Sequence, residues 1–208
     1  MPNQPEDLSS FVSMCRSSEY LILDTETSGL KRPAEVVELS IISSTGEIMF
    51  WELIRPINPY GGIAAQITGI TADMLANRPT WLDLRPRIEA ILKDRDIVVY
   101  NATFDRHMFR CSDESNQLPV FKWSEHSRWW CAMKAFAEYR HYWDDYHGNW
   151  AWAKLTEAAR FCNVEVTDAH RAVGDCLMTA LVVKHMIDEL KDLDVEQIAH
   201  WSSEHYDR

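Results

Sequence analysis

The order of apolar segments in this 208-residue chain predicts an α/β domain in which a mixed five-stranded sheet is covered by helices on both faces. Five short runs rich in apolar and β-branched residues have the length of strands, and longer amphipathic segments have the 3.6-residue period of helices. The first three strand-like runs follow one another closely, whereas the last two are separated by helical segments. This order predicts an antiparallel meander followed by strands that are joined through helices.

The N-terminal half contains the predicted meander. Residues 7–16 have the apolar spacing of a short amphipathic helix, and the apolar run 20–23 has the length of a strand. Residues 36–42 and 48–54 predict the second and third strands, with a turn at residues 44–46 between them. Because such a short turn joins antiparallel neighbours, we expect these strands to pair in sequence order.

Helices dominate the rest of the chain. Two further strands are expected at residues 96–100 and 129–132. The predicted helices cover residues 72–76, 80–93, 104–111, 152–161, 172–190 and 195–201. Apolar residues of the segment 172–190 fall on one stripe, which predicts a long helix that is buried along one side.

Composition predicts a soluble protein of the reducing cytoplasm. No apolar run approaches the ~20 residues needed to cross a bilayer, and the N-terminus lacks the pattern of a signal peptide. The five cysteines include no CxxC pair, which disfavours a zinc site and a disulfide framework. We expect residues 1–19 to form an N-terminal extension with a short helix, residues 20–192 the main domain, and residues 193–208 a C-terminal helix packed on it.

The net charge of −11 bears on the ligand. Proteins that bind nucleic acid over a wide surface are usually basic. Two interpretations stay open at this point. Either the acidity includes a metal site that divalent cations neutralise, or nucleic acid is not the ligand.

Acidic residues stand where predicted strands end or helices begin. Asp24 and Glu26 end the first strand, and side chains two residues apart on a strand point to the same face. Asp105 follows the fourth strand, and Asp175 lies near the start of the apolar segment 172–190. Taken singly, the first pair could mark a surface turn, and Asp105 could simply favour the positive end of a helix.

A histidine lies close to the last of these acids in the sequence. His170 precedes Asp175 by five residues, so the two would not share a face of one continuous helix. We therefore expect His170 on the loop that enters the helix, although a lone histidine there is more often a plain surface residue. Together, four carboxylates offer hard oxygen ligands for Mg²⁺ or Mn²⁺, and the histidine offers a base. Pairs of such ions serve phosphoryl chemistry.

Three motifs resemble those of the DnaQ-like DEDDh 3′→5′ exonucleases. They read Leu-Asp-Thr-Glu-Thr-Ser-Gly-Leu at residues 23–30, Tyr-Asn-Ala-Thr-Phe-Asp at residues 100–105 and Ala-His-Arg-Ala-Val-Gly-Asp at residues 169–175. The three occur in the order of the family and at plausible separations. Within that family, the stretches that begin at Cys131 and Val195 and the pair 175–176 are most similar to exodeoxyribonuclease X.

This resemblance implies an RNase H-like fold and a centre with two Mg²⁺ ions, for which Mn²⁺ could substitute. Asp24, Glu26 and Asp175 would ligate one ion, with Asp24 bridging to the second, and Asp105 would hold that second ion. His170 would be the general base. The substrate-binding residues implied by the resemblance are Thr25, Thr27, Leu30, Asn101, Phe104 and Arg171.

The implied function is a 3′→5′ exonuclease that releases 5′-mononucleotides from DNA ends, prefers single strands and serves DNA repair. The alternatives are an exoribonuclease, a proofreading or nucleic-acid-binding subunit of a polymerase or repair assembly, a non-catalytic binder, and another kind of phosphodiesterase. The tryptophan-rich segment and the habit of the family are compatible with a homodimer, and no membrane partner is expected.

Aromatic residues concentrate in residues 123–152, which hold six of the nine tryptophans. Such rings could stack on nucleobases, which contributes ~1–3 kcal/mol per base in single-strand binders. They could equally fill the core or an interface. The sequence leaves both interpretations open.

Overall fold

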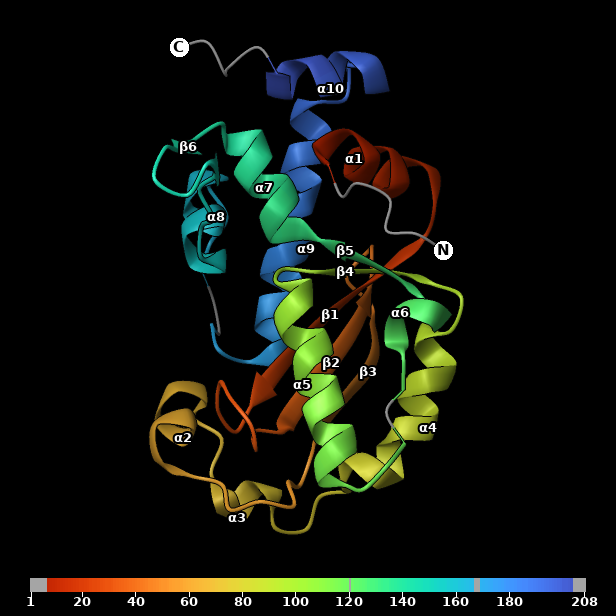
Figure 1. Cartoon of the computed structure of the whole chain (residues 1–208), viewed down its shortest axis with the longest axis vertical. Coiled ribbons are helices and arrows are strands. Elements are labelled where there is room, and N and C mark those ends of the chain that lie inside the picture. The colour runs from red at the N-terminus through yellow and green to blue at the C-terminus, as the bar shows by residue number, and fades with distance from the viewer. Residues whose placement is uncertain (1–6, 120, 167–168, 204–208) are drawn as a thin grey trace.

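The computed structural model describes residues 7–119, 121–166 and 169–203. Its central sheet has the strand order β3-β2-β1-β4-β5. The strands are β1 (Tyr20–Thr27), β2 (Val36–Ser43), β3 (Ile48–Leu53), β4 (Asp96–Val99) and β5 (Arg128–Cys131). Strands β1, β2 and β3 pair antiparallel in sequence order, whereas β4 is parallel to both β1 and β5. The predicted meander and mixed five-stranded sheet are thus confirmed (Figure 1).

Helices occupy most of the remaining described residues. They are α1 (Leu8–Ser17), α2 (Gly62–Thr68), α3 (Ala72–Leu75), α4 (Trp81–Leu92), α5 (Ala102–Ser115), α6 (Trp123–His126), α7 (Ala132–Arg140), α8 (Leu155–Phe161), α9 (Ala172–Glu189) and α10 (Val195–Ser203). The patterns above do not predict α2, α6 and α7. Helix α8 begins three residues later than predicted, because the Glu157 carboxylate accepts the backbone N–H of Lys154 and so caps the helix there. Within the described ranges, no helix is both long enough and apolar enough to cross a membrane.

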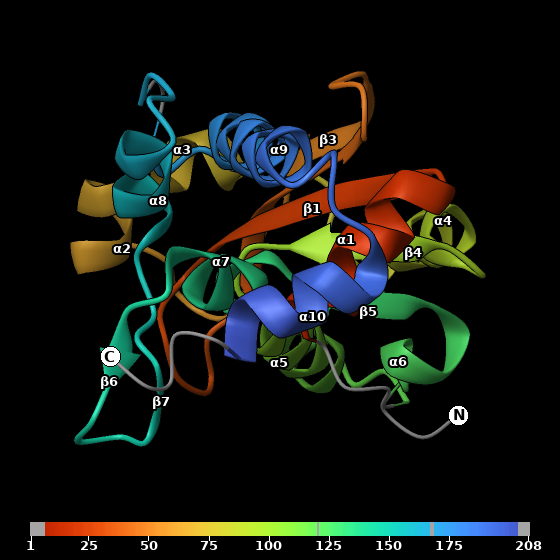
Figure 2. The same cartoon turned by 90° about the horizontal axis from the view of Figure 1, so that it is seen from above.

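Alternation along the strands divides the core between the two faces of the sheet. Ile22 and Val98 belong to a buried cluster with α1, α7 and α9, whereas Leu23, Ile97 and Val99 belong to a second cluster with α4 and α5. Figure 2 shows α9 and α5 on opposite sides of β1. The prediction of helices on both faces is therefore confirmed.

The two terminal helices lie together at one end of the molecule. The guanidinium of Arg16 in α1 donates to the carbonyl oxygens of Leu190, at 2.6 Å, and Leu193, at 2.9 Å, in the segment that leads to α10. Ile198 of α10 is fully buried in the cluster that includes α1 and α9. Residues 1–6 and 204–208 of the predicted terminal segments lie outside the described residues, and the division at residues 19 and 192 remains a prediction.

The aromatic segment divides between core and surface. Trp123 and Trp129 are buried, with ring centroids 4.9 and 5.8 Å from that of Phe109. Trp143 and Trp150 pair across a short hairpin, β6 (Trp143–Asp144) and β7 (Asn149–Trp150), with centroids 5.2 Å apart. Trp152, in contrast, is 64% exposed. Packing therefore accounts for part of the segment, and Trp152 remains available to a ligand.

Candidate active site

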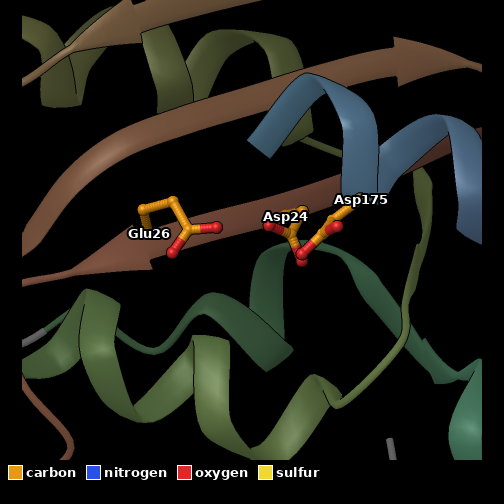
Figure 3. A group of neighbouring side chains, drawn as sticks. All are labelled: Asp24, Glu26 and Asp175. Atoms are coloured by element: carbon orange, nitrogen blue, oxygen red, sulfur yellow. The ribbon is translucent and has the colours of Figure 1, made fainter. Parts of the chain in front are cut away.

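Three carboxylates meet at the C-terminal end of β1. Asp24 and Glu26 continue the alternation of Ile22, so their side chains lie on the face of the sheet that α9 covers. Asp175 comes from the first turn of α9. One oxygen from each of these three residues lies within 4.8 Å of the other two. Figure 3 shows the Asp24 and Asp175 carboxylates side by side, with that of Glu26 directed toward them.

The proximity of these acids raises their pKa values. Burial and then the charges of Asp105, Asp175 and Glu26 raise the pKa of Asp24 well above its usual range. Burial and then the charges of Asp175 and Glu38 raise the pKa of Glu26 to about 8. For Asp175, burial raises the pKa to about 6 against the opposing effect of His170. Ionising the group near neutral pH is therefore unfavourable unless a cation is present.

The donor set fits a hard divalent cation. Carboxylate oxygens are the ligands that Mg²⁺ and Mn²⁺ prefer, and a buried Asp175 oxygen, Oδ1, has no hydrogen-bond partner. Buried polar atoms are nearly always satisfied, so this oxygen is a natural metal ligand. Asp24, Glu26 and Asp175 can therefore hold a divalent metal.

Asp105, the fourth predicted ligand, lies near this group but outside it. It sits in the first turn of α5, which follows β4, the parallel neighbour of β1. Its carboxylate accepts a hydrogen bond from Thr25 Oγ1 at 2.7 Å and is 4% exposed. Burial raises the pKa of Asp105 to about 7, although the Thr25 bond opposes that rise. Asp105 is thus oriented by β1 itself and contributes to the high pKa of Asp24.

His170 lies on the loop that enters α9, as predicted. It precedes the N-cap residue Arg171, is exposed, and has a left-handed backbone with φ of 66°. Both its backbone and its ring favour the ionised form of Asp175. The histidine therefore adjoins the acidic group and faces solvent, where it can exchange protons.

Glu38 is a buried acid beside the site to which the sequence patterns assign no role. It lies on β2 directly opposite Glu26 and has no exposed surface. Its carboxylate accepts hydrogen bonds from Arg171 Nη2 at 2.7 Å, from Arg171 Nε at 3.1 Å, from the Ala172 backbone N–H at 3.1 Å and from Trp51 Nε1 at 2.8 Å. Burial raises its pKa, but these bonds outweigh that effect and lower it.

The six predicted substrate-binding residues have different environments. Arg171 is bound to Glu38, and Thr25 donates to Asp105. Thr27 is buried and donates to the Gly29 carbonyl at 2.8 Å, whereas Leu30 is 77% exposed. Asn101 and Phe104 line a pocket of about 370 Å³, whose other lining residues are Thr103, His107, Cys131, Met133, Lys134 and Trp152. These two residues therefore lie in a hollow that sequence patterns do not reveal, and none of the four acids is among its eight lining residues.

Comparison with known proteins agrees with this geometry. A family model described as Exonuclease matches residues 21–183. The chain belongs to the exonuclease family. It is 36% identical over 168 residues to the uncharacterised exonuclease CP81 of Escherichia phage 186, a match that covers 79% of this chain and 86% of that protein.

Two further comparisons connect the family to polymerases and to a solved fold. The DNA polymerase III PolC-type of Caldanaerobacter subterraneus subsp. tengcongensis is 23% identical over 189 residues, which is 89% of this chain but 13% of that polymerase. Among solved structures, exonuclease X in complex with 5′ overhanging duplex DNA has 26% identity and a TM-score of 0.59, covering 88% of this chain and 99% of that chain. The expected RNase H-like fold and the resemblance to DnaQ-like exonucleases are confirmed.

Proposed function

We propose that this protein is a metal-dependent 3′→5′ exonuclease that removes 5′-mononucleotides from the ends of DNA and prefers single strands. The observation that carries the proposal is the group of Asp24, Glu26 and Asp175, whose ligand oxygens lie within 4.8 Å of one another. One oxygen of Asp175, Oδ1, is buried without a hydrogen-bond partner. Membership of the exonuclease family supports hydrolysis of phosphodiester bonds at a strand end.

Each polar residue of the site has a defined role in this proposal. Two Mg²⁺ ions, or Mn²⁺ in their place, supply the positive charge that activates water and stabilises the leaving oxygen. Asp24, Glu26 and Asp175 would hold one ion, and Asp24 and Asp105 would be the ligands of the other. Thr25 keeps the Asp105 carboxylate in a fixed orientation through its 2.7 Å hydrogen bond.

The exposed histidine supplies the base. His170 takes a proton from the attacking water and then releases it to solvent, which its surface position allows. The adjacent Asp175 carboxylate stabilises the imidazolium that forms. His170 has a left-handed backbone just before the N-cap of α9. The proposed base therefore lies on the entry loop, and the proposed metal ligand Asp175 lies in the first turn of the helix.

The pocket lined by Asn101, Phe104 and Trp152 favours an unpaired nucleotide in this proposal. Pockets of roughly 300–1,000 Å³ take small organic ligands, so a volume of about 370 Å³ suits one nucleotide rather than a base pair. Phe104 and the exposed Trp152 offer aromatic faces for a base, and Asn101 offers hydrogen bonds. Leu30, also exposed, would press against the terminal base, and the backbone at Thr25 and Thr27 would meet its sugar and phosphate. The solved complex of exonuclease X with DNA supports DNA as the substrate.

The acidic surface supports recognition of an end rather than of a long duplex. A net charge of −11 disfavours extended contact with phosphates, since those contacts require basic surface. Metal ions at the site would neutralise the local acidity where the terminal phosphodiester binds. The two interpretations of the charge are reconciled if nucleic acid binds mainly at this one place.

A proofreading subunit is the second candidate function. The match to one segment of a PolC-type polymerase favours it, because there an exonuclease-like segment is part of a polymerase chain. In that case the protein would associate tightly with a polymerase and act weakly alone. The exoribonuclease alternative, the homodimer, the role in DNA repair and the cytoplasmic location remain predictions.

A degradation assay with labelled strands tests the proposal. Matched single-stranded DNA and RNA carry a label at the 5′ end, and Mg²⁺ or EDTA is added. We expect a descending ladder on DNA with Mg²⁺ and none with EDTA or with Asp24→Ala. A ladder chiefly on RNA would make the protein an exoribonuclease. Immediate release of a labelled mononucleotide would reverse the proposed direction, and an intact strand would refute hydrolysis by this protein alone.

A further inference from the structure

The buried Glu38 and the partly exposed Arg171 form a clamp between β2 and the start of α9. The guanidinium of Arg171 donates two hydrogen bonds to Glu38, at 2.7 and 3.1 Å, and the Ala172 backbone N–H donates a third at 3.1 Å. Trp51 of β3 donates a fourth at 2.8 Å. The side chain of the N-cap residue Arg171 does not cap α9. The Glu38 carboxylate instead accepts the Ala172 N–H, one of the first N–H groups of the helix, which have no partner within the helix.

The place of this clamp in the site sets its task. Arg171 directly follows His170, and Ala172 lies three residues before Asp175. One carboxylate therefore fixes the backbone between the predicted base and a predicted metal ligand. A helix rises about 1.5 Å per residue, so a shift of the first turn of α9 by one residue would move the Asp175 oxygens by about that distance. A displacement of this size would disturb a metal site, whose ligands must be held in a fixed orientation.

The charge of Glu38 requires an explanation beyond packing. It has no exposed surface and adds a further negative charge beside Asp24, Glu26 and Asp175, whose pKa values it raises. A neutral side chain at this position would lessen that repulsion. The ion pair with Arg171, at 2.7 Å, offsets the cost, and the fork of the guanidinium gives the pair a fixed geometry.

We propose that Glu38 and Arg171 act as positioning residues that hold His170 and Asp175 in register with Asp24 and Glu26. This inference rests on the proposed function for the identity of the metal site. It assigns Arg171 a structural partner in place of the substrate contact that the resemblance implies. It also gives a role to a carboxylate that is neither a metal ligand nor a base.

Calorimetric titration with Mg²⁺ separates positioning from simple electrostatics. The variants are Glu38→Gln, Arg171→Gln and the double variant. If charge alone mattered, removing the positive Arg171 would tighten Mg²⁺ binding. The clamp predicts the opposite: each single variant weakens Mg²⁺ binding by about 10–100-fold, the range typical of groups that orient metal ligands. The double variant should be no weaker than either single one, because both remove the same connection.

Steady-state kinetics on a labelled oligonucleotide give the second readout. We expect each variant to lower kcat by about 10–100-fold at saturating Mg²⁺ and to leave KM within about threefold. Arg171→Lys, which keeps the charge and one hydrogen bond, should recover part of the loss. A rise in KM with Arg171→Gln alone, absent in Glu38→Gln, would instead assign Arg171 to the substrate and overturn the clamp.

Asp96 offers a matched control. It is 3% exposed and accepts two hydrogen bonds from Arg128, both at 2.6 Å, and one from Trp130 at 2.9 Å, but it begins β4 beside Tyr20, the far end of β1 from the acids. Asp96→Asn should lower the melting temperature while leaving Mg²⁺ affinity unchanged. If Asp96→Asn weakened Mg²⁺ binding as much as Glu38→Gln does, the effect of Glu38→Gln would reflect a general loss of stability and not the positioning of His170 and Asp175.

The outcomes for the proposed function and for the clamp are distinct. A wild-type protein that binds Mg²⁺ but degrades no polynucleotide would refute the exonuclease, while the titrations would still decide the clamp. A wild-type protein that binds no Mg²⁺ would overturn both. If Glu38→Gln does not fold, Arg171→Gln and Arg171→Lys carry the test, because the Arg171 side chain is 38% exposed and tolerates change more readily.

Discussion

Replacing Glu26 with glutamine tests whether the acids repel one another as the geometry requires. Burial and the charges of Asp175 and Glu38 raise the pKa of Glu26 from its ordinary 4.5 to about 8. One pKa unit corresponds to about 1.4 kcal/mol, so ionising Glu26 lowers the free energy of unfolding by at most about 5 kcal/mol. Neighbouring carboxyls share protons and relieve part of this cost. We expect Glu26→Gln to raise the unfolding free energy of the metal-free protein at pH 9 by about 2–4 kcal/mol.

The sign of the pH dependence follows from the raised pKa. Because the pKa of Glu26 is higher in the folded protein than in the unfolded chain, this group does not destabilise the protein below its ordinary pKa of 4.5. The free energy of unfolding then falls as the pH rises from there toward about 8. The variant and the wild type should therefore be equally stable near pH 4 and diverge above it. Urea unfolding in EDTA, followed by tryptophan fluorescence between pH 4 and pH 9, measures the difference.

Asp96 provides a control of opposite sign. Burial raises its pKa, but the hydrogen bonds from Arg128 outweigh that effect and lower it, so Asp96 contributes stability that is lost as the pH falls. Asp96→Asn should therefore be less stable than the wild type at neutral pH and approach it in acid. A Glu26→Gln difference that is the same at pH 4 and pH 9 would show that the carboxylates do not form a repulsive cluster.

Three further predictions concern activity and metal binding. His170→Ala should lower kcat by roughly 10²–10⁴-fold with an unchanged melting temperature, because the side chain is exposed; normal turnover would remove it as the base. Trp152→Ala should raise KM for single-stranded DNA by roughly 5–150-fold, the equivalent of ~1–3 kcal/mol for one stacked base, and Trp152→Phe should recover part of this. Tyr146→Ala serves as its control, because Tyr146 is 90% exposed and does not line the pocket; equal effects of the two substitutions would show that the pocket does not bind the base. Mg²⁺ affinity measured by calorimetry should tighten from pH 6 to pH 8, because Asp175 and Glu26, with pKa values of about 6 and 8, must lose protons to bind the ion; a pH-independent affinity would place the ion elsewhere.

The sheet and its two layers are predictable from the sequence because strand alternation and strand order are local properties. Ile22 and Leu23 are adjacent and both apolar, which indicates that both faces of the sheet are covered, and the structure places them in the two separate clusters. Helix α7 escapes the pattern because it follows β5 without a separating turn or a capping side chain at Cys131. Short helices such as α2 carry too few residues to display a period.

The acidic centre is predictable for a different reason. Asp24 and Glu26 share a strand face by spacing alone, and the ordered motifs bring Asp105 and Asp175 to the same edge. The Glu38–Arg171 pair is not predictable in this way, since its partners lie 133 residues apart and only the folded sheet makes them neighbours. The same holds for the pocket, where Phe104 and Trp152 meet from separate segments. For Glu38, the sequence offers one indication of a special role: Glu35 and Glu38 are charged residues within an otherwise apolar segment.

The most direct test of the central claim is the position of a bound metal. Crystals soaked in Mn²⁺ locate the ion through its anomalous scattering. We expect an ion bound by oxygens of Asp24, Glu26 and Asp175 at contact distances of about 2 Å, with the peak lost in Asp24→Ala crystals. A peak away from these three carboxylates, or none at a Mn²⁺ concentration that supports activity, would contradict the assignment of this group as the catalytic metal centre.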